Sequence, residues 1–205
     1  MNDSLFRGRL VRLTAEDPGV LAKTHVGWGR DSEYRRLLDD GPPWLWSQHA
    51  IEAWIKENQD GPAGKSYEFD LHTLQDDRLI GFVGLGLDHK SHGEAWVGIG
   101  IGGRDDWGKG YGTDAMETVL RYAFEELNLY RVSLDVFENN PRALRSYEKA
   151  GFSVEGRERQ ALRRDGRRMD VIVMGILRDE WRRRQAGYRD DLQIEAAGRS
   201  KPGGF

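Results

Sequence analysis

A glycine-rich segment in the middle of the chain has the composition of a phosphate-binding loop. It covers residues 106–115 and reads DWGKGYGTDA, between a predicted strand and a predicted helix. Alternating glycines let a backbone approach a ligand closely and direct several N–H groups at one point. The N-terminus of the following helix adds a positive partial charge, and Lys109 adds a cation. The segment therefore predicts a pyrophosphate cradle.

Three classes of ligand could use such a cradle. Residues 103–109 fit the G-x-x-x-x-G-K pattern of a P-loop, but Gly110 follows where the Mg²⁺-binding hydroxyl should stand. Residues 110–115 fit the G-x-G-x-x-A pattern of a dinucleotide-binding unit, and Asp135 lies about 20 residues beyond it. Against that reading, a meander of strands precedes the loop, where alternating strands and helices would be expected. The third class is coenzyme A.

A second motif favours coenzyme A. Residues 140–152 read NPRALRSYEKAGF and follow the next predicted strand. Together, the two segments resemble the acyl-CoA-binding motifs of the GNAT superfamily of N-acetyltransferases, in which a Q/R-x-x-G-x-G/A loop precedes an N-x-x-A-x-x-x-Y-x-x-x-G-F stretch. The resemblance extends from Leu5 to Leu177. Trp107 departs from the commoner Gln or Arg, and resembles the branch of ribosomal-protein N-terminal and spermidine acetyltransferases.

The resemblance implies a donor, acetyl-CoA (coenzyme A), and a direct attack by a neutral amine without an acyl-enzyme. The absence of Cys agrees with that route. Tyr147 would protonate the departing thiolate, and its ordinary pKa of about 10 suits that task. The implied cofactor-binding residues are Gly98, Ile99, Ile101, Trp107, Gly108, Lys109, Gly110, Tyr111, Gly112, Thr113, Asn140, Arg142 and Ala143.

The general base is less well defined. Related enzymes often carry Glu in the strand that contains Gly98, and here Trp96 occupies the matching place. Glu94 lies two residues before it, on the same face of a regular strand. We therefore predict Glu94 as the second catalytic residue, acting directly or through water, with Asp135 as the weaker alternative.

Hydrophobic periodicity predicts the elements that must position these residues. Strands are expected at residues 5–13, 67–71, 79–87, 95–101, 131–137 and 171–177, with a hairpin turn at 165–166. Helices are expected in pieces over 18–38 and at 48–58, 112–127, 141–150 and 179–185. The order predicts an α+β fold with a GNAT-like central mixed, mostly antiparallel sheet flanked by helices. We expect a single domain over residues 1–185 and a polar, Gly-rich C-terminal tail over 186–205.

Composition excludes several classes of protein. The chain has 205 residues, of which 38% are hydrophobic and 32% charged, and a net charge of -3. With no basic field, nucleic acid is not an expected partner. Without cysteine there are no disulfides or thiolate metal sites. His89 and His92 fall in a turn, so no metal is predicted. No apolar run is long enough to span a bilayer, so we expect no membrane partner and a cytoplasmic location.

The acceptor is left open by the sequence. It is expected to be a small-molecule or peptide amine: a protein N-terminus, a polyamine, an amino sugar or an amino acid. Residues 22–58 should select it, because they precede the cofactor motifs and would cover the cleft. The side chains weighed there, against ordinary packing or solvated surface, are Trp28, Trp44, Trp46, Trp54, Asp39, Asp40, Glu52 and Glu57.

Two other functions stay open alongside the acetyltransferase. One is a noncatalytic acyl-CoA-binding sensor on the same fold, because Trp96 replaces the strand Glu. The other is a nicotinamide-dependent oxidoreductase. A homodimer is the default assembly. The arginines at positions 163, 164, 167 and 168 predict a solvated hairpin, with ribosomal RNA or the 3′-phosphate of coenzyme A as alternative contacts.

Overall fold

One seven-stranded sheet forms the centre of the molecule. The computed structural model describes residues 5–59, 65–87 and 90–186. The strands lie in the order β1-β2-β3-β4-β5-β7-β6, and β4 and β5 are the parallel neighbours in an otherwise antiparallel sheet. This confirms the predicted α+β fold with a mixed, mostly antiparallel sheet, and it excludes a doubly wound dinucleotide-binding sheet. The strands are β1 (Val11–Thr14), β2 (Ser66–Thr73), β3 (Leu79–Gly86), β4 (Glu94–Ile101), β5 (Arg131–Phe137), β6 (Ser153–Arg164) and β7 (Arg167–Leu177).

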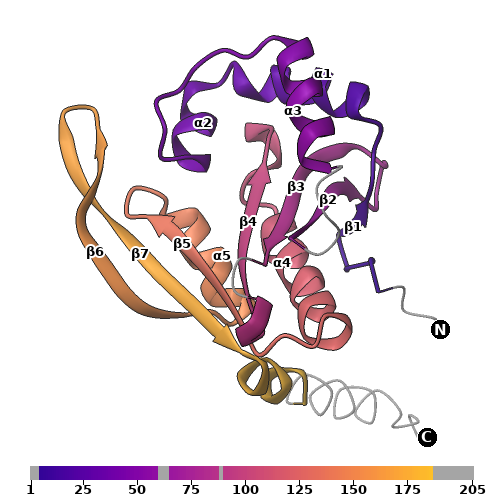
Figure 1. Ribbon diagram of the computed structural model, residues 1–205, viewed down its shortest axis with the longest axis vertical. Coiled ribbons are helices and arrows are strands. Elements are labelled where there is room, and N and C mark those ends of the chain that lie inside the picture. Colours follow the sequence, from indigo (N-terminus) through magenta and orange to yellow (C-terminus); the bar gives the residue numbers. More distant parts are fainter. Residues whose placement is uncertain (1–4, 60–64, 88–89, 187–205) are drawn as a thin grey trace, which may run out of the picture.

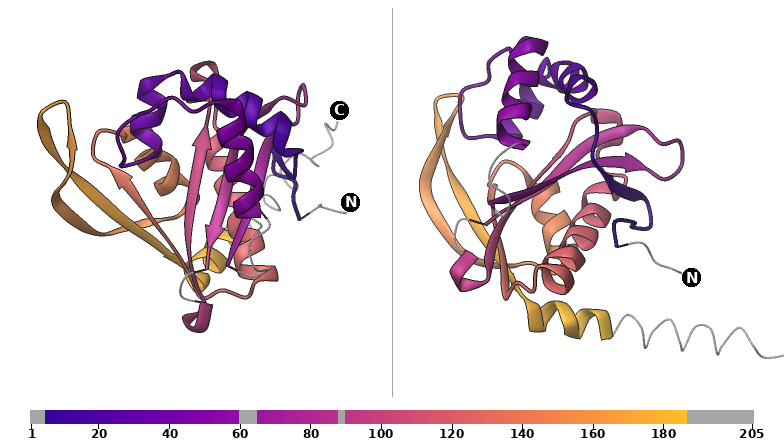
Figure 2. Two further views of the ribbon diagram at one scale, coloured as in Figure 1. Left: turned by 45° about the horizontal axis from the view of Figure 1, so that its top comes forward. Right: turned by 45° about the vertical axis from the view of Figure 1, so that its right-hand side comes forward.

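Helices cover both faces of the sheet (Figures 1 and 2). On one face lie α1 (Pro18–Gly29), α2 (Ser32–Leu38) and α3 (Gln48–Gln59); on the other lie α4 (Tyr111–Arg121) and α5 (Pro141–Ala150). Short helices η1 (Lys90–His92), η2 (Arg104–Asp106) and the π-helix η3 (Tyr122–Glu126) connect them, and residues 178–186 are also helical. None of the described helices is both long and apolar enough to cross a membrane.

The amphipathic pattern of α4 sets the position of the glycine-rich loop. Its apolar residues recur at helical spacing and are fully buried against the sheet: Ala115, Met116, Val119 and Leu120. The helix begins at Tyr111, after the N-cap residue Gly110, and continues into the π-helix η3. The packed face fixes the helix axis, so its first turn points to the end of β4.

The two parallel strands pair over only part of their length. β4 and β5 pair at Glu94 with Arg131, Ala95 with Val132 and Trp96 with Ser133. Beyond Trp96, β4 continues to Ile101 beside β3, while β5 continues to Phe137 beside β7. The facing edges of the two strands therefore have no strand partner beyond that point, and their backbone groups need another one.

Two predicted elements differ from the structure. The first strand, expected over residues 5–13, is limited to β1, because Gly8 N–H donates to Val11 O in a tight turn (2.8 Å) and an isolated bridge pairs Arg7 with Arg12. The last strand begins at Arg167, not at residue 171. Its added residues, 167–170, belong to the arginine-rich arm that β6 and β7 form (Figure 1). They are exposed or half-buried, so they show no apolar pattern.

The tip of this arm lies beside α2. The Arg36 guanidinium pairs with the Asp165 carboxylate at 2.9 Å, and Arg164 donates to the backbone carbonyl of Asp39. Of the arginines expected on a solvated hairpin, Arg164 is thus buried against the end of α2. The predicted tail from residue 187 onward lies outside the described residues.

Candidate active site

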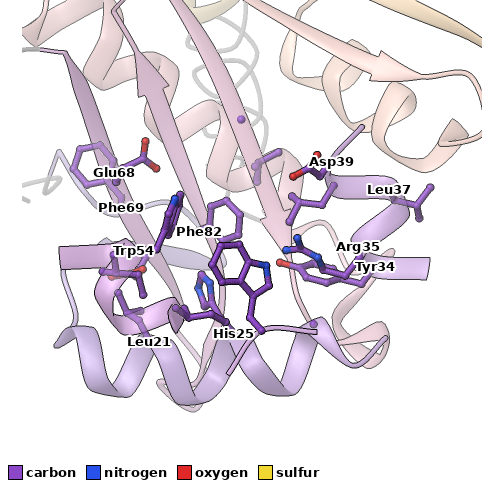
Figure 3. A pocket seen from close by; sticks show the side chains of 18 of the residues that line it. Leu21, His25, Tyr34, Arg35, Leu37, Asp39, Trp54, Glu68, Phe69 and Phe82 are labelled. Carbon is purple, nitrogen blue, oxygen red and sulfur yellow. The ribbon is translucent and has the colours of Figure 1, made fainter. Parts of the chain in front are cut away.

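Two cavities meet beside the parted end of β4. The larger, of about 900 Å³, lies between the sheet and the helices α1, α2 and α3 (Figure 3). The smaller, of about 330 Å³, lies between the glycine-rich loop, the start of α4 and α5. Residues that line both are Tyr34, Leu37, Leu38, Ile99, Asn140 and Tyr147. The predicted acid, Tyr147, therefore stands at the junction.

The smaller cavity collects most of the predicted cofactor-binding residues. Gly110 is the N-cap of α4 with φ of 90°, a conformation that suits glycine, and Gly108 has φ of 76°. No side chain caps the helix, so the N–H groups of its first turn are directed to the cavity. The predicted residues that line it are Ile99, Ile101, Trp107, Gly108, Gly110, Tyr111, Gly112, Thr113, Asn140, Arg142 and Ala143.

Two predicted residues lie elsewhere. Gly98 lines the larger cavity, on the face of β4 turned away from the loop. Lys109 lines neither cavity, and its ammonium group lies 3.8 Å from the buried carboxylate of Asp106. The cations found instead beside the smaller cavity are Arg142, Arg145 and Lys149. Sequence reasoning missed the last two, although they lie three and seven residues after Arg142, a spacing that places all three on one face of α5.

Trp107 ties the loop to the sheet and to α5. Its indole N–H donates to the Ile101 carbonyl at 2.7 Å, and the Arg142 guanidinium lies 3.8 Å from the ring centroid. Burial lowers the pKa of Arg142, but a guanidinium remains charged at any physiological pH. Trp107 thus replaces the usual Gln or Arg with a stacked platform that holds a cation at the cavity. Backbone donors together with cations suit a pyrophosphate and a phosphate monoester.

Asn140 and Tyr147 are positioned by α5. The Asn140 side-chain oxygen accepts the Ala143 N–H at 3.1 Å, which caps the helix and leaves its amide donors for a ligand. Tyr147 lies about two turns further on and is 9% exposed. Burial raises the pKa of Tyr147 above its ordinary value, and the negative charge of Asp135 acts in the same direction. The phenol therefore stays protonated and can only give its proton to a strong base.

Glu94 does not join this group. It is the first residue of β4, where β4 and β5 still pair, and its carboxylate accepts from Arg131 Nε at 3.2 Å and from Ser133 Oγ at 2.9 Å. It lines neither cavity. The prediction placed it on the correct face of the strand but at the wrong end, because the sequence does not show where the strands part. The alternative base, Asp135, does line the larger cavity.

The larger cavity is aromatic and acidic. The helices of the predicted acceptor region, residues 22–58, cover it, with Trp46 and Trp54 in its wall. Of the other two tryptophans, Trp28 packs on His25 with ring centroids 5.0 Å apart, and Trp44 packs edge-on against Trp46 at 4.8 Å. The carboxylates in the wall are Asp39, Glu68, Asp70 and Asp135.

Two of these carboxylates were missed by sequence reasoning. Glu68 and Asp70 alternate with Tyr67, Phe69 and Leu71 in β2, a pattern typical of a strand with one face in solvent. Here that polar face lies under α1 and α3 instead. Burial raises the pKa of Glu68 to about 7 and that of Asp70 to about 6. The presence of two acids on one face of this strand could have indicated that the face lines a binding cavity.

The described part of the chain contains no cluster of His, Asp and Glu side chains that could hold a metal ion. Of the predicted H-x-x-H pair, His89 lies outside the described residues. His92 is exposed at the end of η1.

The chain is similar in sequence to known proteins. Residues 7–153 match the family model described as an acetyltransferase (GNAT) domain. An uncharacterized N-acetyltransferase, p20, of Bacillus licheniformis is 29% identical over 181 residues, which cover 87% of this chain and 98% of that protein. The spermidine N(1)-acetyltransferase of Vibrio cholerae is 36% identical over 103 residues, half of this chain and 59% of that protein.

A solved structure extends the similarity to the whole fold. The crystal structure of spermidine N-acetyltransferase from Vibrio cholerae in complex with CoA and spermine superimposes with a TM-score of 0.73. It is 26% identical and covers 83% of this chain and 97% of that one. With the family model spanning well over half of the sequence, the chain belongs to the GNAT family of acetyltransferases and uses acetyl-CoA as its acetyl donor.

Proposed function

We propose that this enzyme transfers the acetyl group directly to a primary amine of a small cationic molecule held in the larger cavity. The junction of the two cavities carries the proposal, since Ile99 on the unpaired edge of β4 and the Tyr147 phenol both lie there. A donor held in the smaller cavity would present its acyl group at that point. An acceptor in the larger cavity would approach the same point from the opposite side.

Different residues would bind the donor, stabilise the developing negative charge and protonate the leaving sulfur. The loop N–H groups at the start of α4, with Arg142 and Arg145, would hold the phosphates of the donor. A free N–H on the parted edge of β4 would donate to the oxygen that becomes negative when the amine attacks. The Tyr147 phenol would protonate the departing sulfur, which becomes basic in the same poorly hydrated place that raises the pKa of the phenol.

The charge of the larger cavity favours a cationic acceptor. Glu68 and Asp39 point into it from opposite sides (Figure 3). Carboxylates lose hydration when a ligand fills the cavity, and a bound ammonium group offsets the free-energy cost of that loss. Aromatic rings such as Phe82 and Trp54 can cover the methylene groups between two amines. The similarity to spermidine acetyltransferases points in the same direction, so a polyamine is the first acceptor to test.

An amine panel tests this function. Acetyl-CoA is supplied with spermidine, glucosamine, lysine or a short peptide with a free N-terminus, while thiol release and acetylated product are measured. We expect turnover with spermidine to exceed that with the peptide by at least tenfold in kcat/KM. A chain that is thermally stabilised by acetyl-CoA but acetylates no amine would be the noncatalytic sensor instead. Stabilisation by NADH and not by coenzyme A would contradict both readings.

Gly110→Ala is expected to weaken donor binding. A side chain at a φ of 90° costs about 1–2 kcal/mol, and the loop can relieve this by moving the N–H groups that face the cavity. We therefore expect the Kd for coenzyme A, measured by calorimetry, to rise roughly tenfold. The control is Gly27→Ala in α1, where an added methyl group meets nothing within 4 Å. Equal affinities in the two variants would remove the loop from the donor site.

A further inference from the structure

Glu68 stands in one row with two glycines across three strands. In the register of the sheet, Glu68 of β2 pairs with Gly84 of β3, and Gly84 pairs with Gly98 of β4. Directly paired residues present their side chains on the same face. The row therefore runs along the floor of the larger cavity, from the carboxyl group of Glu68 to the point where β4 leaves β5.

The two glycines leave this row open for the Glu68 side chain. A Cβ atom at Gly84 would lie 2.0 Å from Glu68 Oε2, so the carboxyl group lies over Gly84 in the space that a side chain there would fill. A Cβ atom at Gly98 would meet nothing within 4 Å. Since neighbouring strands are about 4.8 Å apart, about one strand spacing separates the carboxyl group from the space above Gly98. That gap accommodates an amine nitrogen or one water molecule.

We propose that Glu68 is the general base, which accepts the proton that the acceptor amine must lose before it attacks, directly or through one water molecule. The inference rests on the proposed amine acetylation and assigns a residue to its first step. Glu68 provides a carboxylate beside Gly98, a position that Glu94 does not reach because it lies where the strands are still paired. In this chain the base is a residue of β2, and its side chain extends over Gly84 of β3 toward Gly98 of β4.

The surroundings of Glu68 suit that role. Its carboxylate accepts no hydrogen bond from the described residues, and the side chain is exposed within the cavity that it lines. The charged or titratable groups that share the cavity with it and with Tyr147 are Asp70, His25, Arg30, Tyr34, Arg35, Asp39 and Asp135. Burial, and then the charge of Asp70, raise the pKa of Glu68 to about 7. Burial holds the pKa of His25 at about 4, so this imidazole is neutral and does not neutralise the carboxylate.

The proton balance of the reaction is complete with two residues. The ammonium group R–NH₃⁺ gives one proton to the Glu68 carboxylate, and the free amine forms a C–N bond at the thioester carbon. The C–S bond then breaks, and the sulfur takes the proton of the Tyr147 hydroxyl. The second proton lost by the nitrogen restores that hydroxyl, and Glu68 releases its proton to solvent. The products are the N-acetyl amine, the free thiol and one proton.

The pH dependence of Glu68→Gln tests the proposal. In the wild type, kcat/KM with spermidine should rise with pH to about 7 and then level off, because the base works only when ionised. The variant should lose roughly 10² in kcat at pH 7, and its rate should keep rising toward the amine pKa of about 10. Glu52→Gln in α3 is the control, since Glu52 pairs with Lys56 and lies outside both cavities; its profile should match the wild type.

A second pair of variants moves the carboxylate without removing it. Gly84→Ala places a methyl group where Glu68 Oε2 lies and should displace the flexible end of that side chain, so kcat falls as in Glu68→Gln. Gly86→Ala lies on the same face of β3, and its nearest contact would be at 3.9 Å, so activity should persist. Similar melting temperatures in both variants would show that the sheet itself is intact.

The possible results separate this proposal from the proposed function. A wild type that acetylates no amine defeats the function. An active wild type whose Glu68→Gln variant keeps kcat and the same pH profile, but has a higher KM for the amine, makes Glu68 a cation anchor and overturns the assignment as base. Loss of rate at pH 7 with recovery at alkaline pH, in Glu68→Gln and Gly84→Ala alike, supports it.

Discussion

Tyr147→Phe is expected to lower kcat by roughly 10² or more, with little change in the KM for acetyl-CoA. The substitution removes one oxygen atom at the junction of the two cavities and keeps the ring that packs edge-on against Phe152, with centroids 6.2 Å apart. The sulfur must then leave as an unprotonated thiolate in a poorly hydrated place, so the cost falls on the chemical step and not on donor binding. Steady-state kinetics with varied acetyl-CoA separates the two parameters.

The leaving group provides a sharper readout of the same residue. An S-phenyl thioester donor releases a thiophenolate, which is a far weaker base than the coenzyme A thiolate. The Tyr147→Phe variant should therefore recover most of its rate with this donor. Tyr130→Phe is the matched control, because Tyr130 is 51% exposed on a loop and lines neither cavity. If Tyr147→Phe turned over acetyl-CoA at the wild-type rate, the phenol would have no part in proton transfer.

Asp114→Ala is expected to lower the free energy of unfolding by about 3 kcal/mol or more. The Asp114 carboxylate is buried in the first turn of α4 and accepts the backbone N–H groups of Arg9, Leu10 and Val11 at 2.9, 2.8 and 2.9 Å. Without it, the three N–H groups lose their shared acceptor, and the turn that precedes β1 loses these hydrogen bonds to α4. Urea denaturation followed by circular dichroism measures the change.

Its control is a neighbouring acid on the same helix. Glu117→Ala removes a carboxylate that pairs with the exposed Arg9 guanidinium at 2.7 Å, and an ion pair of this kind contributes about 1 kcal/mol or less. Asp114→Ala should therefore be several times more destabilising than Glu117→Ala. If the two variants unfolded at the same urea concentration, the three backbone hydrogen bonds would contribute nothing net to the fold.

The cofactor side of the site could be predicted from the sequence, because short segments of the chain determine it. The spacing of glycines in residues 106–115 and of Asn140 and Tyr147 in the next motif fixes a loop, a helix start and a helix face over short distances along the chain. The apolar periodicity of α4 predicted its buried face for the same reason.

The acceptor side depends on register, which no short segment encodes. Glu68 reaches Gly98 only through pairing with Gly84, and these residues are 16 and 14 positions apart in the sequence. Glu94 lines neither cavity for the same reason. The face of its strand follows from counting residues, but its distance from the site depends on where two strands separate in space. The polar face of β2 belongs to the site because its cover, α1 and α3, comes from another part of the chain.

Helix α2 forms a wall common to both cavities through Tyr34, Leu37 and Leu38. Its start is tied to η2 by the ion pair of Asp31 with Arg104, and its end to the β6–β7 arm by Arg36 and Asp165. A molecule in either cavity therefore touches a helix that the other cavity also needs. By thermodynamic linkage, any adjustment of α2 that one substrate induces changes the affinity for the other by the same factor. A movement of the seven residues of α2 on binding one substrate would therefore couple donor and acceptor binding.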